Sequence, residues 1–254
     1  MVELGLATYL ILLAVGLAAG FVDSIAGGGG IITIPALLSV GLPPHLALGT
    51  NKLQSSFGSL TATVSYRYHG MMRLRQTLFG VLCTAIGAAT GTYVIQRIPA
   101  DFLRQAIPIL LAAIFLYTLF SPRLGHVRGR AVMTRPVFHL IFGLGLGFYD
   151  GFFGPGTGSF WAIAYVALLG FEFTRATAWT KVMNFTSNLV ALIVFAIGGH
   201  VVLLPGLVMG AGQAIGAGIG SRMVVRRGAK FVRLFFLIVV AATIARLIYQ
   251  TYGK

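Results

Sequence analysis

Runs of about 20 mostly apolar residues, separated by loops that carry arginine, recur along the whole chain. A bilayer core about 30 Å thick needs about 20 residues of helix to cross it. The chain is 57% hydrophobic and only 9% charged, whereas a soluble domain is about a quarter charged. We therefore predict an all-α polytopic membrane protein with eight long helices, near 4–22, 45–68, 74–95, 103–120, 136–153, 174–197, 202–222 and 231–250.

The charge balance points to anions rather than to nucleic acid. Nineteen Lys and Arg against five Asp and Glu give a net charge of +14. In a soluble protein this excess suggests nucleic-acid binding. In a membrane protein, basic residues gather in cytoplasmic loops and also attract anions. We expect the lipid bilayer and a small anion as partners, and no nucleic acid.

Motifs for catalysis or cofactor binding are absent from the sequence. Cys83 is the single cysteine, which excludes internal disulfides and Cys-rich metal sites. No nucleophile elbow, phosphate-binding loop, haem-attachment motif or zinc motif occurs. The first 26 residues lack the basic start of a cleaved signal peptide. We predict that the protein is not an enzyme, holds no cofactor or metal, and is not an ATP-driven pump.

Two apolar segments, 31–41 and 158–170, are too short to cross a bilayer. As helices they would cover about 16 and 20 Å, because each residue adds about 1.5 Å. Each follows a glycine-rich stretch, Gly27 to Gly30 in the first case and Gly154-Pro155-Gly156 in the second. They are predicted to be half-helices that begin inside the membrane.

The chain contains an internal repeat. Gly20-Phe21-Val22-Asp23 recurs as Gly147-Phe148-Tyr149-Asp150, an offset of 127 (150 − 23), and Lys52 recurs as Lys181, an offset of 129 (181 − 52). Each half reads as a long helix, a break with Asp and Gly, a half-helix and three long helices. We assign residues 1–120 to the first repeat, 121–135 to a cytoplasmic linker and 136–254 to the second repeat.

The distribution of Lys and Arg predicts that the two repeats are inverted. If each first helix and its half-helix form a re-entrant hairpin, three true crossings remain per half, and an odd number inverts the second half. With both termini on the periplasmic side, four basic residues lie outside and thirteen lie inside, in agreement with the positive-inside rule. The outer set is Arg97, Arg104, Arg246 and Lys254, and the inner set is Arg67, Arg73, Arg75, Arg123, Arg128, Arg130, Arg135, Arg175, Arg222, Arg226, Arg227, Lys230 and Arg233.

The breaks suggest an anion site near the membrane midplane. The first N–H groups of a helix and the positive end of its dipole bind anions, and two half-helices would point both ends at one place. The candidate residues at these ends are Gly28, Gly29, Gly30, Gly156, Thr157 and Gly158. The alternative is that the glycines only permit tight helix packing.

Lys52 and Lys181 strengthen the anion hypothesis, because a charge inside an apolar helix is costly and needs a partner. Ammonium, hydroxyl and amide groups all donate hydrogen bonds to oxyanions. The neighbouring candidates are Thr50, Asn51, Ser55 and Ser56 in the first half and Asn184 and Asn188 in the second. The alternative is that the lysines pair with Asp23 and Asp150, and both arrangements fit one cycle in which the anion competes for the lysines.

The remaining polar and aromatic residues have structural or coupling interpretations. Asp23 and Asp150 are expected to cap the half-helices, or alternatively to bind and release a coupling proton. His45, His69, His139 and His200, with Trp161 and Trp179, are expected at the membrane interface. Gly143, Gly147, Gly212, Gly216 and Gly220 are predicted to allow close helix contacts.

The motifs around the two breaks resemble those of a known family. The stretch Asp23 to Gly30 followed by Gly49-Thr50-Asn51-Lys52, together with Asp150 to Gly158 and Thr180-Lys181 through Asn184, is similar to the doubled motif of the sulfite exporter TauE/SafE family, also called the sulfonate uptake permease family. The resemblance covers essentially the whole chain. It implies a bacterial inner-membrane permease for sulfite, sulfonates or related anions.

Together these features predict a secondary anion transporter. It would export sulfite, or a related small sulfur oxyanion or organosulfonate, by alternating access of the two repeats. An uptake permease for another organic or inorganic anion, and an anion channel, remain alternatives. A membrane enzyme acting on lipid or quinone would need a reactive constellation, and the sequence shows none.

Overall fold

The computed structural model describes residues 4–72, 74–120 and 130–227, and all regular secondary structure in these ranges is helical. The predicted helix at 231–250, both chain ends and most of the predicted linker lie outside them. The elements are α1 (Leu6–Ala26), α2 (Gly29–Ser39), α3 (Pro44–Tyr68), η1 (Leu74–Gln76), α4 (Leu78–Ile95), α5 (Ala100–Phe120), α6 (Arg135–Phe138), η2 (His139–Gly143), α7 (Leu144–Phe152), α8 (Thr157–Leu169), α9 (Phe173–Ile197) and α10 (Leu203–Arg227).

Five of the described helices are long and apolar enough to cross a membrane: α1, α4, α5, α9 and α10. Helix α3 has the same length as α9, 25 residues, but is not among them. The polar residues Asn51, Lys52 and Gln54 lower its hydropathy, and the structure buries all three. Helix α3 packs against α1, α9 and α10, which shield its polar face from lipid.

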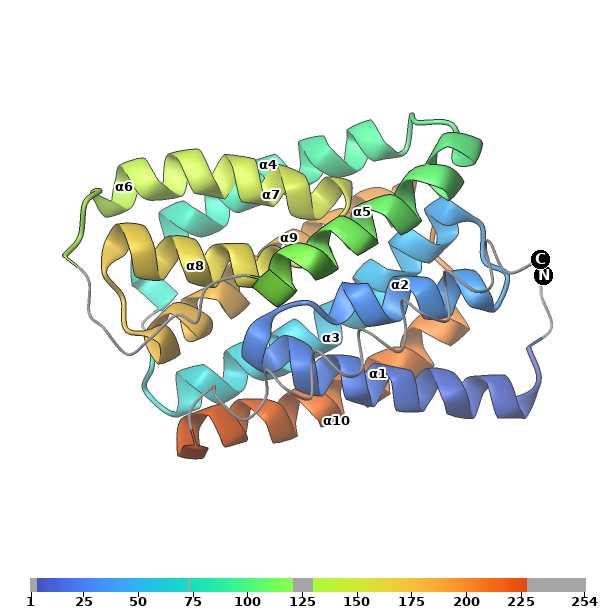
Figure 1. Ribbon diagram of the computed structural model, residues 1–254, viewed down its shortest axis with the longest axis horizontal. Coiled ribbons are helices and arrows are strands. Elements are labelled where there is room, and N and C mark those ends of the chain that lie inside the picture. Colours follow the sequence, from blue (N-terminus) through green and yellow to red (C-terminus); the bar gives the residue numbers. More distant parts are fainter. Residues whose placement is uncertain (1–3, 73, 121–129, 228–254) are drawn as a thin grey trace.

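The bundle is held together by close contacts between helices from opposite halves of the chain. Helix α1 packs along α10, α4 packs along α7, and α3 crosses α9 between these pairs (Figure 1). Glycines make the approach possible: a Cβ atom at Gly216 would lie 2.0 Å from the carbonyl oxygen of Leu17, and one at Gly147 would lie 2.6 Å from that of Thr84. The predicted packing role of these glycines is confirmed.

A buried aromatic cluster replaces the predicted interfacial tryptophans. Trp161 and Trp179 are both fully buried, so the prediction that they anchor the protein at the membrane interface is wrong. His139 is also buried and stacks on Trp179, with ring centroids 6.1 Å apart. Phe138 and Tyr165 complete the contacts around them. These rings fill the space between α8, α9 and the α6–η2 segment, where sequence alone gave no sign of a core.

The two short helices position the candidate site. Helix α2 follows α1 after Gly27 and Gly28, and α8 follows α7 after a four-residue turn, Phe153 to Gly156. Figure 1 shows α2 and α8 running from the middle of the molecule toward opposite ends. The turns touch: the hydroxyl of Ser159 donates to the carbonyl oxygen of Gly27 at 2.9 Å, and a Cβ at Gly27 would lie 2.4 Å from the Cα of Gly158.

Candidate functional site

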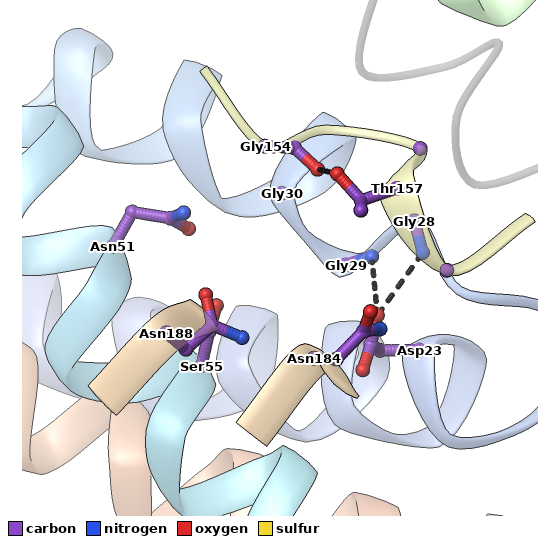
Figure 2. A pocket seen from close by; sticks show the side chains of 12 residues that line it. Asp23, Gly28, Gly29, Gly30, Asn51, Ser55, Gly154, Thr157, Asn184 and Asn188 are labelled. Atoms are coloured by element: carbon purple, nitrogen blue, oxygen red, sulfur yellow. Dashed lines mark hydrogen bonds between the residues drawn. The ribbon is translucent and has the colours of Figure 1, made fainter. Parts of the chain in front are cut away.

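A pocket lies where the first residues of α2 and α8 meet. Its space is about 330 Å³, including the part that is open to solvent. Side chains from α3 and α9 face the two glycine-rich turns across it (Figure 2). The lining residues are Asp23, Gly28, Gly29, Gly30, Asn51, Ser55, Gly154, Gly156, Thr157, Gly158, Asn184 and Asn188.

Most of the substrate-binding residues predicted from sequence line this pocket, and four do not. Thr50 accepts a hydrogen bond from the N–H of Val202 at 2.9 Å, and Ser56 donates to the carbonyl oxygen of Lys52 at 2.8 Å. Neither lines the pocket, and neither do Lys52 and Lys181. The lysines instead form ion pairs with the two aspartates, the alternative arrangement that the sequence had left open.

Lys52 pairs with Asp150 across the two halves of the chain. Its Nζ lies 2.7 Å from Oδ1 of Asp150, and both side chains are almost completely buried. The same ammonium donates to Oδ1 of Asn188 at 3.3 Å, and the hydroxyl of Ser187 donates to Oδ2 of Asp150. A buried ion pair needs such additional hydrogen bonds to offset the loss of hydration. Each charge here has them.

Lys181 pairs with Asp23 in the reciprocal arrangement. Its Nζ lies 3.1 Å from Oδ2 of Asp23, and it also donates to the backbone carbonyl of Asp23. The other carboxylate oxygen, Oδ1, accepts the N–H groups of Gly28 at 3.0 Å and Gly29 at 3.3 Å. Asp23 therefore caps α2 and pairs with Lys181 at once. Its side chain is 20% exposed, because it borders the pocket.

Asp150 does not occupy the corresponding capping position. Its two carboxylate oxygens are taken by Lys52 and Ser187, and in the described part of the chain no carboxylate accepts an N–H group at the start of α8. The N-cap of α8 is Gly156, with φ of 80°, in the left-handed region that favours glycine. Among the described residues, no carboxylate is bonded to the positive end of α8, and this end borders the pocket.

Amide groups provide the remaining polar wall of the pocket. Asn51 belongs to α3, and Asn184 and Asn188 belong to α9. The Oδ1 atom of Asn184 is buried and has no hydrogen-bond partner. An unpartnered amide oxygen of this kind costs less free energy than a buried donor without a partner.

Three further residues, Gly154, Thr33 and Ser187, belong to this site or support it and were not predicted from the sequence. A Cβ atom at Gly154 would lie 2.7 Å from the Nζ of Lys52, so glycine is what lets the ammonium approach the pocket wall. Thr33 bonds to Asn51, and Ser187 bonds to Asp150. Ser187 lies three residues after Asn184, on the same helical face, and this spacing was the available signal. Within the described ranges, no three His, Cys, Asp or Glu side chains gather as metal ligands would.

Comparison with known proteins identifies the family. The family model for the sulfite exporter TauE/SafE matches residues 12–247. The chain belongs to the sulfite exporter TauE/SafE family. It is 44% identical to the probable membrane transporter protein YfcA of Escherichia coli (strain K12) over 96% of this chain and 91% of that protein. It is 43% identical to a probable membrane transporter protein of Haemophilus influenzae, over 98% and 97% of the two chains.

A more distant TauE/SafE relative shows that the likeness extends beyond bacteria. The sulfite exporter TauE/SafE family protein 6 of Arabidopsis thaliana is 30% identical over 101 residues, which is 39% of this chain and 23% of that protein. No solved structure gives a significant match. Together with the five apolar helices, the family assignment makes this chain a membrane protein of a TauE/SafE transporter family.

Proposed function

We propose that this protein is a secondary anion transporter of the inner membrane that moves sulfite, or a related small sulfur oxyanion or organosulfonate, by alternating access. The observation that carries the proposal is the pocket itself, which the first residues of both short helices share with three buried amides. Helix N-termini and amide N–H groups suit oxyanions, whose oxygens only accept hydrogen bonds. The sulfur chemistry rests on the family name.

Charge neutrality around the pocket favours an anion over a cation. Lys52 and Lys181 add two positive charges and Asp23 and Asp150 add two negative ones, so the formal sum is zero (2 − 2). Asp23 already caps the start of α2, so the positive end of α8 remains as the net attraction for a negative ligand. The Lys52 ammonium also lies against Gly154 in the pocket wall, so an entering anion is placed to compete with Asp150 for it.

An inverted repeat supplies the alternating motion in this proposal. Equivalent contacts in the two halves support it. The contact of α1 with α10 corresponds to that of α7 with α4, and the ion pair Lys52–Asp150 corresponds to Lys181–Asp23. Helix α1 also begins at the opposite end of the molecule from α6 (Figure 1). Rocking of one repeat against the other would expose the pocket to each side in turn. An inside-negative potential favours anion export by about 2.3 kcal/mol per charge per 100 mV.

The test is sulfite counterflow in proteoliposomes, with sulfate and an organosulfonate as competitors. We expect saturable exchange in the unmodified protein and a loss of at least tenfold in Asn184→Leu and Asn188→Leu, which remove pocket amides. The control is Ser39→Ala, whose exposed hydroxyl bonds only within the end of α2. The double variant Lys52→Met with Asp150→Leu removes one ion pair without leaving a buried charge, and we expect it to fold but not to exchange sulfite.

Other outcomes would contradict the proposal in different ways. Flux that does not saturate and shows no counterflow would make the protein a channel. Exchange of another anion without exchange of sulfite would make it a permease for that anion. Unchanged sulfite exchange in the amide variants would mean that the pocket is not the binding site.

A further inference from the structure

Three buried side chains form a hydrogen-bonded group beside the pocket, joining α2 to α3. The hydroxyl of Thr33 lies 2.6 Å from Oδ1 of Asn51, and Nε2 of Gln54 lies 2.7 Å from the same oxygen. Nε2 of Gln54 also lies 3.1 Å from the Thr33 hydroxyl. Of the three residues only Asn51 lines the pocket. We call Thr33 and Gln54 the Asn51 clamp.

The clamp determines which end of the Asn51 amide faces the pocket. The single hydrogen of the Thr33 hydroxyl has two acceptors in reach, Oδ1 of Asn51 at 2.6 Å and the carbonyl oxygen of Gly29 at 3.0 Å, and the contact to Asn51 is the shorter. Nε2 of Gln54 donates to the same Asn51 atom, and only the oxygen of an amide accepts hydrogen bonds. The alternative is to rotate the side-chain amides of Asn51 and Gln54 by 180°. The NH2 group of Gln54, with its two donors, would then lie where its unpartnered Oε1 now lies. Buried donors without partners are rarer and costlier than an underused carbonyl oxygen. The arrangement with Oδ1 of Asn51 in the clamp is therefore the stable one, and its NH2 group is directed to the pocket side.

A second amide is held in the same sense from the other half of the chain. Oδ1 of Asn188 accepts a hydrogen bond from the Lys52 ammonium, which leaves the NH2 group of Asn188 for the pocket. Figure 2 shows Asn51 and Asn188 extending from α3 and α9 into the same space. The clamp has no counterpart in the second half, where the residues 129 positions after Asn51 and Gln54 are Thr180 and Met183.

We infer that Thr33 and Gln54 are positioning residues that present the NH2 donors of Asn51 to the transported anion and thereby set the affinity for oxyanions. The inference rests on the proposed anion site. Without the clamp the amide is free to rotate, and its oxygen would face the oxygens of the ligand. Affinity would then fall. The maximal rate would stay the same, because α2 and α3 belong to one repeat and the proposed cycle moves each repeat as a unit.

The experiment measures KM and maximal rate of sulfite counterflow in proteoliposomes. Thr33→Val removes the hydroxyl at nearly constant volume, and Thr33→Ser keeps it. The matched control is Thr186→Val, because Thr186 is also buried but bonds only to Val182 of its own helix. We expect Thr33→Val to raise KM about fivefold, the fold-change of a typical single hydrogen bond, with the maximal rate within about twofold. Thr33→Ser and Thr186→Val should keep both values.

A second variant keeps the inference falsifiable if Thr33→Val does not fold. Gln54→Met removes the other donor to Asn51, and we expect KM to rise about threefold. If the unmodified protein exchanges sulfite but KM stays constant in the folded clamp variants, or only the maximal rate falls, the clamp has no positioning role while the anion site stands. If the unmodified protein neither exchanges nor binds sulfite, the proposed function is wrong, and so is the positioning role of the clamp.

Discussion

The two glycine-rich breaks begin with the same motif and end in different arrangements. Asp23 caps α2 through Gly28 and Gly29 and gives its other oxygen to Lys181. Asp150 bonds to Lys52 and Ser187 and leaves the start of α8 without a carboxylate cap. One aspartate therefore stabilises a helix end at the pocket edge, and the other belongs to a side-chain network that the protein buries.

The two breaks also differ by a single proline and by one residue in length. Asp23 precedes the start of α2 by six residues (29 − 23), and Asp150 precedes the start of α8 by seven (157 − 150). The residue 127 positions after Gly28 is Pro155, which has no N–H group to donate. A repeat that is nearly symmetric in sequence thus has one helix end that a carboxylate caps and one that no described carboxylate caps.

The largest predicted difference between the two breaks is in stability. Asp150→Asn leaves the Lys52 charge buried, and breaking a buried pair costs about 3–5 kcal/mol, on the order of 10 °C in Tm. Asp23→Asn should cost about half as much, because solvent reaches the 20% exposed side chain of Asp23. Thermal unfolding in detergent measures both, with the exposed Glu172→Gln as control. Equal losses would mean that the two ion pairs are equivalent.

The cap that Asp23 provides for α2 predicts a smaller difference between the two breaks, confined to the start of each short helix. Removing a capping acceptor costs about 1 kcal/mol. Asp23→Ala and Asp23→Asn both break the pair with Lys181, but Asn keeps an acceptor oxygen, so amide exchange in a peptide covering 24–32 should be about fivefold faster in Asp23→Ala than in Asp23→Asn. In Asp150→Ala, a peptide covering 154–160 should change only as much as peptides from α9. Faster exchange confined to 154–160 in that variant would show that Asp150 caps α8 after all.

The smallest effect is expected where the two breaks differ in sequence. Pro155→Gly restores an N–H group but increases the freedom of the unfolded chain, and we expect a loss of about 0.5–1 kcal/mol, a Tm shift of a few degrees. Pro155→Ala should lose less than Pro155→Gly. A loss above about 5 °C in both variants would assign the role of Pro155 to its ring, which lies against Gly30, rather than to its backbone.

Much of the fold follows from the sequence because the bilayer limits the choices. Apolar runs of fixed length must be helices, so segments such as α4 and α9 appear close to their predicted bounds. The short helices α2 and α8 were predictable for the same reason, since too few apolar residues separate each break from the next polar turn. The positions of the two tryptophans were not predicted correctly, because a large aromatic side chain suits a core between packed helices as well as the membrane interface.

The candidate site was predictable in its members but not in its partners. Charged side chains inside apolar helices need partners of opposite charge. The sequence alone therefore predicts that four residues must find such partners: Lys52, Lys181, Asp23 and Asp150. Which lysine meets which aspartate depends on how the halves cross, and the structure pairs each with the opposite half. Thr33 gave no usable signal, because a lone hydroxyl in an apolar helix ordinarily bonds to its own backbone.

The sequence by itself determined the membrane-spanning helical character, the doubled motif and the family, because hydrophobic length and repeated residues are local properties of the chain. Only the tertiary structure decided that Asp23 caps its helix while Asp150 does not, and that Asn51 is held by Thr33 and Gln54. Hydrogen bonds act over about 3 Å, so residues far apart in sequence acquire these roles only when packing brings their atoms within that distance.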